Sequence, residues 1–212
     1  MSMSRVAKIL RHCACVGALL LLGACAFGDR MVTLSYQTET AKAAAATTAT
    51  AAATPASTAS KGTYVLIPLK DERPQKQMVG EVRNGWGMHT ADVVADNDVA
   101  EWVTDGIRQE LAKAGYTVVG SAADDPAAPQ IEGTVTRVFC TALFSYEADV
   151  SFFVVLRRDG KELVNRQYHG TGSAGVNMAA TSGSYKESLN KALADALSDL
   201  LADIRTAQTA GS

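Results

Sequence analysis

One short stretch concentrates the residue types that carry chemistry. Gly80 to Thr90, written GEVRNGWGMHT, holds three glycines, an arginine, a tryptophan, a methionine and a histidine. His89 is suited to proton transfer or metal binding, whereas Trp86 and Met88 are suited to contact with a partner or ligand. His169 is far away in sequence, and neither histidine has a second ligand at the spacing of a zinc site. We therefore expect no metal centre and no cofactor.

The nucleophilic side chains show no catalytic arrangement. No G-x-S-x-G elbow occurs, and the serines of GTGSAG (residues 170–175) and TSGSYK (residues 181–186) are predicted to lie in a flexible loop whose glycines supply turns. GTGSAG also lacks the Lys-Ser/Thr pair that completes a phosphate-binding loop. Cys140 stands in an apolar run and is predicted to be a small buried hydrophobe. These features favour a non-enzymatic protein, with a hydrolase the least favoured alternative.

Asp71 and Arg73 lie two residues apart where the apolar run TYVLIPLKD ends. If the strand continues, both side chains face the same way and can pair. A pair near the surface typically contributes less than about 1 kcal/mol. We therefore predict that it fixes a turn rather than forming a catalytic dyad.

The N-terminus indicates export. Three basic residues precede the apolar run CACVGALLLL, and the small residues of GAC follow it. This run is too short to span a bilayer, which takes about twenty residues. Residues 1–24 are therefore predicted to be a signal peptide.

The end of that segment, Leu22 to Cys25, resembles the lipobox of bacterial lipoproteins. The resemblance implies cleavage before Cys25, a diacylglyceryl group on its thiol and an acyl chain such as palmitate on the new amino terminus. Several acyl chains make membrane attachment stable. An ordinary signal peptide cleaved at A-x-A is the alternative. Ala26, where an aspartate would imply inner-membrane retention, implies the periplasmic face of the outer membrane.

Processing also simplifies charge and cysteine content. Removal of residues 1–24 leaves 17 Lys and Arg against 22 Asp and Glu, a formal charge of −5 with no basic cluster. Nucleic-acid binding is therefore not expected. Cys13 and Cys15 leave with the signal and Cys25 carries lipid, so Cys140 has no disulfide partner.

The mature chain divides into three parts. Residues 25–36 are a lipidated N-terminus with a short strand, in which Val32, Leu34 and Tyr36 share one side. Residues 37–62 form an Ala/Thr-rich tract with no large apolar residue, which is predicted to be disordered. If the strand is free, the tract is a spacer of roughly 28 Å root-mean-square, or about 90 Å fully stretched. If the strand pairs with the sheet, the domain is pinned against the membrane.

Residues 63–208 are predicted to form one α+β domain. A helix opens at a capping box of Asp98 and Glu101 and closes near Gly115; a second opens at Ser184 and Glu187. Asp159-Gly160 is a hairpin signal between two strands. The order is strand-helix-strand-strand-strand-strand-helix, which gives two layers: a mixed sheet of about five strands, with its first two strands parallel and the later ones antiparallel, and two amphipathic helices on one face.

KDERP, GWGM and NDVAEWVTDGIRQELAKAGYTV, downstream of a lipobox, resemble the YajG-type family of bacterial lipoproteins. The features that carry the resemblance are Asp71, Arg73, Gly85, Gly87, Asn97, Asp98, Val99 and the Gly115-Tyr116 pair. The family implies an envelope lipoprotein without an established activity. The architecture is also similar to the amino-terminal domain of TolB and to LpoB-type activators, which are protein-binding α+β modules.

These observations favour a lipid-anchored module that binds another envelope component, either a protein or a peptidoglycan-related partner. The alternative is a carrier of a small ligand or metal that uses the loops around Trp86, His89 and His169. The stretch from Gly80 to Thr90 is predicted to be an irregular crossover loop. We expect Trp86 and Met88 to fold over the sheet in preference to contacting a partner, because buried aromatics stabilise small cores.

Overall fold

The computed structural model describes residues 28–37, 60–176 and 181–210. The predicted signal peptide, Cys25 and residues 38–59 of the Ala/Thr-rich tract lie outside these ranges. The α+β class, a mixed sheet and two helices are confirmed. The number and order of the strands were predicted wrongly, because the sheet has nine strands.

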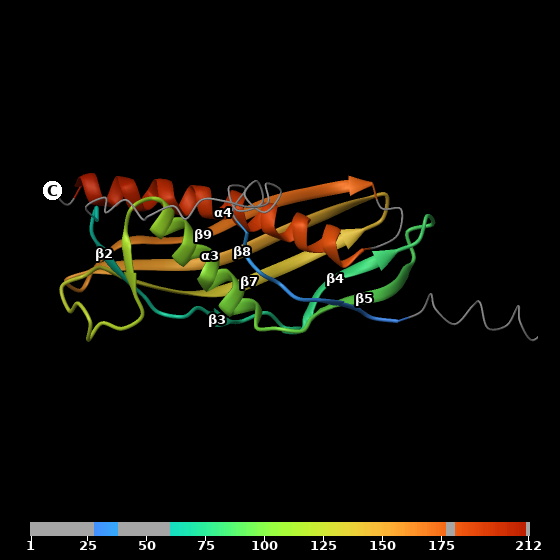
Figure 1. Ribbon diagram of the computed structural model, residues 1–212, viewed down its shortest axis with the longest axis horizontal. Coiled ribbons are helices and arrows are strands. Elements are labelled where there is room, and N and C mark those ends of the chain that lie inside the picture. Colours follow the sequence, from blue (N-terminus) through green and yellow to red (C-terminus); the bar gives the residue numbers. More distant parts are fainter. Residues whose placement is uncertain (1–27, 38–59, 177–180, 211–212) are drawn as a thin grey trace, which may run out of the picture.

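Three long antiparallel strands form one side of the sheet, with β9 at its edge (Figure 1). They are β7 (Gln130–Ala142), β8 (Ser145–Arg158) and β9 (Lys161–Val176). The β8–β9 turn is the predicted one: Asp159 and Gly160 have φ of 52° and 76°, the left-handed conformation that a two-residue hairpin turn needs.

The other edge of β7 pairs with short parallel strands that follow one another along its length. These are β2 (Thr63–Leu66), β3 (Lys70–Asp71) and β4 (Met78–Arg83). Beyond them lie β6 (Thr117–Val119), parallel to β2 as expected, and β5 (His89–Ala95), antiparallel to β4. The sequence yielded only about five strands because β3 is too short for a periodic pattern, and because the stretch that holds most of β4 and the start of β5 was predicted to be an irregular loop.

The stretch from Gly80 to Thr90 is the β4–β5 hairpin, not an irregular crossover loop. Its first glycine is a strand residue: a Cβ at Gly80 would lie 2.2 Å from the carbonyl oxygen of Cys140 on β7. Only Gly85 and Gly87 belong to the turn, and Gly87 has φ of 78°. The three glycines therefore have two different roles.

Two helices cover one face of the sheet, α3 (Val99–Lys113) and α4 (Ser182–Ala210) (Figure 1). The Asp98 carboxylate accepts hydrogen bonds from the backbone N–H groups of Ala100 and Glu101, which confirms the predicted cap. The helices pack against each other at Gly106, where a Cβ would lie 2.9 Å from Leu193. The second helix begins two residues before the predicted cap at Ser184.

The segment GTGSAG lies in β9, so the prediction of a flexible loop with turn glycines was wrong. A Cβ at Gly170 would lie 2.2 Å from the carbonyl oxygen of Ala192, and one at Gly172 would lie 2.3 Å from that of Ser188. Both clashing oxygens belong to α4. The glycines therefore let the helix backbone lie directly on the strand.

The N-terminal segment docks on the domain. Strand β1 (Arg30–Val32) pairs in parallel with β5, and Val32, Leu34 and Tyr36 are buried in the main core, on one side as their alternation predicted. Leu34 N–H donates to Asn97 Oδ1 at 2.8 Å, and Asn97 Nδ2 donates to Leu34 O at 2.9 Å. Of the two arrangements left open by the sequence, the structure has the docked one.

Candidate functional site: an apolar end of the sheet

Four large apolar side chains are exposed at one end of the sheet. Their exposed fractions are 88% for Trp86, 58% for Met88, 68% for Phe144 and 72% for Val176. The expectation that Trp86 and Met88 fold over the sheet was therefore wrong. Surface apolar side chains scattered singly are ordinary, but several gathered in one place indicate a contact site.

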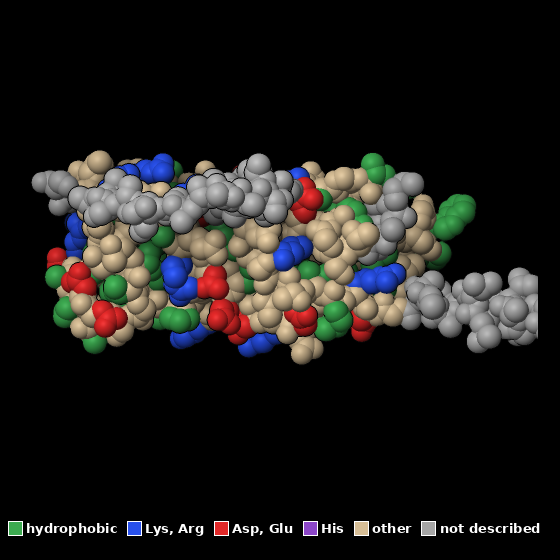
Figure 2. Space-filling model, viewed as in Figure 1, with side chains coloured by type: hydrophobic (Ala, Val, Ile, Leu, Met, Phe, Trp, Pro, Cys, Tyr) green, Lys and Arg blue, Asp and Glu red, His purple; other side chains and the backbone are tan. Residues whose placement is uncertain are grey.

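The strand registers bring these four residues to the same end. Val82 on β4 is level with Ala142 on β7, so the β4–β5 turn projects beside the β7–β8 turn that carries Phe144. Ser145 pairs with Val176, the last residue of β9. Figure 1 shows the turns and strand ends meeting at the right, and Figure 2 shows apolar side chains projecting there. The site is the apolar end, defined by Trp86, Met88, Phe144 and Val176.

The turn that presents Trp86 is held by its own hydrogen bonds. Asn84 Oδ1 accepts from the backbone N–H groups of Trp86 and Met88, both at 3.0 Å. Arg83 Nη1 donates to Gly87 O at 2.9 Å, and Arg83 Nε donates to Glu81 Oε1 at 2.7 Å. These hydrogen bonds hold the turn in one conformation, so the exposed tryptophan is presented on an ordered support.

The two histidines are not brought together. His89 Nε2 lies 2.7 Å from Asp92 Oδ1 on β5, whereas His169 is on β9, and β4, β7 and β8 lie between those strands. Within the described ranges, no group of three or more His, Cys, Asp or Glu side chains has the geometry of a metal site. His89 thus contacts a neighbouring carboxylate at the base of the hairpin turn.

His169 has a partner that sequence reasoning missed. Its Nδ1 lies 2.9 Å from Ser151 Oγ on the neighbouring strand, where the two residues are directly opposite. Ser151 and His169 are eighteen positions apart in the chain, so only the β8–β9 register could have revealed that they are neighbours. A catalytic triad needs a third group that orients the histidine. In the described part of the chain, the only hydrogen bond of the His169 ring is the one to Ser151.

Asp71 and Arg73 pair as their spacing suggested, but deeper than expected. Arg73 is only 4% exposed, and its Nε and Nη2 donate to the two carboxylate oxygens of Asp71 at 3.0 and 2.9 Å. Arg73 also donates to the carbonyl oxygens of Met78, at 2.9 Å, and Lys76. Burial raises the pKa of Asp71, but the hydrogen bonds and charge of Arg73 outweigh it and leave that pKa lowered. The pair fixes the chain between β3 and β4.

Cys140 is fully buried on β7, as its apolar context predicted. Burial raises the pKa of its thiol to about 12. A thiol is nucleophilic only as the thiolate, so Cys140 is an inert core residue at neutral pH.

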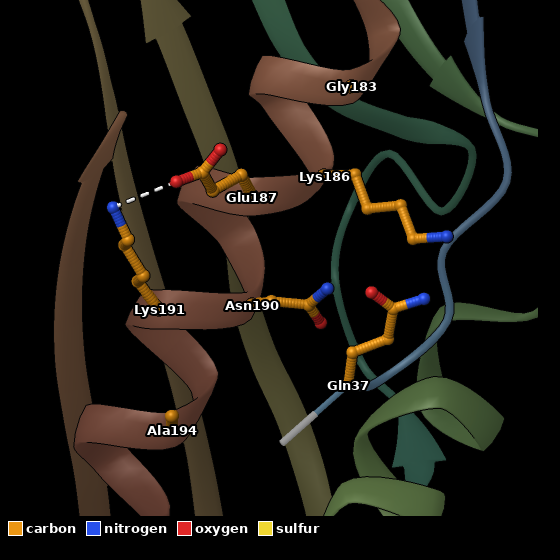
Figure 3. Close-up of a pocket in the computed structure, with 7 residues that line it drawn as sticks. All are labelled: Gln37, Gly183, Lys186, Glu187, Asn190, Lys191 and Ala194. Carbon is orange, nitrogen blue, oxygen red and sulfur yellow. Dashed lines mark ion pairs between the residues drawn. The ribbon is translucent and has the colours of Figure 1, made fainter. Parts of the chain in front are cut away.

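A groove of about 340 Å³ runs along α4 beside Gln37 (Figure 3). Its polar side chains take part in structural contacts: Asn190 Nδ2 donates to Ser35 O at 3.0 Å, and Lys191 Nζ lies 3.1 Å from Glu187 Oε1. Lys186 and Gln37 also point into it. The groove therefore lies where the N-terminal segment packs on α4.

In the described residues, no helix is both long and apolar enough to cross a membrane.

Comparison with known proteins identifies the class. The family model described as "uncharacterized lipoprotein" (Lipoprotein_16) matches residues 50–209, which is most of the chain. The chain therefore belongs to this lipoprotein family, and the resemblance to YajG-type lipoproteins is confirmed. No match was found among curated protein sequences.

One solved structure has a similar fold. Protein XCC0632 from Xanthomonas campestris is 11% identical, with a TM-score of 0.50 over 87% of this chain and 99% of that one. An uncharacterized protein is 8% identical, with a TM-score of 0.49 over 84% and 98%. Lipoprotein GNA1162 from Neisseria meningitidis is 17% identical, with a TM-score of 0.33 over 71% and 99%. At these identities the likeness to XCC0632 concerns the fold alone, and the two lower scores carry no argument.

Proposed function

We propose that the chain is an outer-membrane lipoprotein, anchored on the periplasmic face through Cys25, that binds another envelope component without catalysis. The observation that carries this proposal is the apolar end. Trp86 is 88% exposed, so it lacks the stabilisation that an aromatic side chain normally gains by burial on folding. A hydrogen-bonded turn holds it in this exposed position. Such an arrangement suits a contact residue.

Site-specific photocrosslinking in bacterial cells tests the proposal. A photoreactive phenylalanine analogue replaces Trp86 in the full-length chain, and a matched control carries it at Lys161, which is exposed at the opposite end of β9. We expect products from position 86 that position 161 does not give. Equal yields from the two positions would contradict binding at the apolar end.

Mass spectrometry tests the anchor separately. The mature protein should begin at Cys25 and carry the mass of a diacylglyceryl group and an additional acyl chain. A Cys25→Ser variant should lack that mass and leave the membrane fraction. Detection of an unmodified Cys25 in the mature protein would refute the anchor without affecting the crosslinking result.

A further inference from the structure

The direction of β1 relates the apolar end to the membrane. Strand β5 runs from the hairpin turn at His89 towards Ala95, and β1 is parallel to it, with Arg30 opposite Val93. The chain therefore enters the domain from the side of the hairpin turn. In Figure 1 the described segment before β1 leaves the domain at the end where the β4–β5 hairpin projects.

The chain between Cys25 and β1 is long enough to reach the level of the turn. Arg30 is five residue steps from Cys25, and five steps span at most roughly 17 Å. Val93, opposite Arg30, lies four strand residues from His89, a rise of about 13 Å, and Trp86 projects further still. The reach of the anchor and the reach of the hairpin are thus nearly equal.

The docking of the N-terminal segment keeps the chain between the anchor and the domain short. Beyond the β1–β5 pairing, Thr33 Oγ1 donates to Asp96 Oδ2 at 2.7 Å, and Tyr36 Oη donates to Glu110 Oε1 at 3.0 Å. The long tract comes after these contacts in the chain, so it adds no length between the lipid and the domain.

We infer that the apolar end docks on the lipid surface that holds the anchor, with Trp86 and its neighbours at the membrane interface. This inference rests on the proposed lipid anchor and names the component that the apolar end contacts. Tryptophan is enriched at membrane interfaces, where an amphipathic ring meets both water and acyl chains. Acyl chains at Cys25 and several apolar side chains together hold the surface more stably than either alone.

The charges at this end favour an apolar rather than an electrostatic contact. The Arg83 guanidinium of the hairpin is paired with Glu81 at 2.7 Å, and His89 Nε2 lies 2.7 Å from Asp92 Oδ1. Docking should therefore occur on zwitterionic lipid and should depend little on salt.

The chain offers its own probe for this contact. It has two tryptophans, and Trp102 on α3 is only 2% exposed, with Nε1 donating to Asn190 Oδ1 at 3.3 Å. The lipidated full-length protein is reconstituted in phosphatidylcholine vesicles with ordinary or brominated acyl chains, because bromine quenches tryptophan at short range. We expect brominated lipid to quench the emission of one of the two tryptophans, since Trp86 faces lipid and Trp102 is inside the protein.

Two variants control the experiment. Trp86→Phe removes the exposed probe and should abolish the quenching. Trp86→Phe with Lys161→Trp moves the exposed tryptophan to the opposite end, where quenching should also be absent. Equal quenching from both ends would overturn the inference.

The crosslinking described above separates the two proposals. Lipid adducts at position 86 would support membrane docking. Protein or glycan adducts without bromine quenching would overturn membrane docking and leave the binding function standing. Neither adducts nor quenching would overturn both.

Discussion

Two glycine-rich segments look alike in the sequence and do opposite things in the molecule. In GTGSAG, Gly170 and Gly172 face inward and let α4 lie on β9, with no room for a Cβ at either position. In GEVRNGWGMHT the turn glycines, Gly85 and Gly87, have no atom within 4 Å of a built Cβ. The first segment serves packing, and the second projects side chains away from it. A glycine in the sequence therefore does not show by itself whether close packing or a turn excludes a side chain at that position.

Filling the space under α4 should have a large effect. In Gly170→Ala the new methyl group would meet the backbone of α4 at 2.2 and 2.4 Å, and backbone cannot move aside as a flexible side chain can. We expect a loss of about 3 kcal/mol in the free energy of unfolding, at the upper end for overpacked cores. Urea unfolding followed by circular dichroism measures it.

Gly85→Ala is the matched control in the other segment. Open space surrounds this glycine, and the substitution should change the free energy of unfolding by less than about 0.5 kcal/mol. Equal losses in the two variants would remove the distinction between the segments.

The sequence predicted those elements whose signals are local. The helix at Val99–Lys113 has a cap in Asp98, and the β8–β9 hairpin has Asp159-Gly160 at its turn, so the sequence signal for each element lies within a few residues. The alternation of Val32, Leu34 and Tyr36 likewise predicted which side would be buried.

The errors arose where the deciding partner is distant in the chain. A glycine is needed at position 80 because the Cys140 backbone lies close to it. One is needed at position 170 because the Ala192 backbone does. The apolar end joins three separate chain segments, so only Trp86 and Met88 could be found from one stretch of sequence. Phe144 stood between two apolar strands and carried no signal of its exposure.

The stability of the chain that leads into the β4–β5 hairpin should depend on Arg73, whereas the tip of that hairpin should contribute little to stability. In Arg73→Met the partly buried Asp71 carboxylate and two carbonyl oxygens lose their donor, and an unsatisfied buried group costs about 1–3 kcal/mol. We expect a loss of about 2 kcal/mol at neutral pH. The loss should fall mainly on β3 and β4, which hydrogen exchange can locate.

The same variant has a defined pH dependence. Because the folded pKa of Asp71 is lowered, its contribution is present above the unfolded pKa of roughly 4 and is lost as the pH falls through the folded value. The difference in unfolding free energy between wild type and Arg73→Met should therefore narrow below about pH 4. A constant difference across the acid range would show that the Asp71 charge contributes little.

The smallest effect should come from the tip itself. Trp86 is almost fully exposed, and its backbone hydrogen bond to Asn84 does not require the indole, so Trp86→Ala should change the free energy of unfolding by less than about 0.5 kcal/mol. Trp102→Ala is the matched comparison, because it empties a buried site of the same side chain and should cost about 3–5 kcal/mol. Chemical denaturation of both variants measures the contrast. A loss above about 1 kcal/mol in Trp86→Ala would mean that the tip stabilises the fold, and its exposure would then no longer argue for a contact surface.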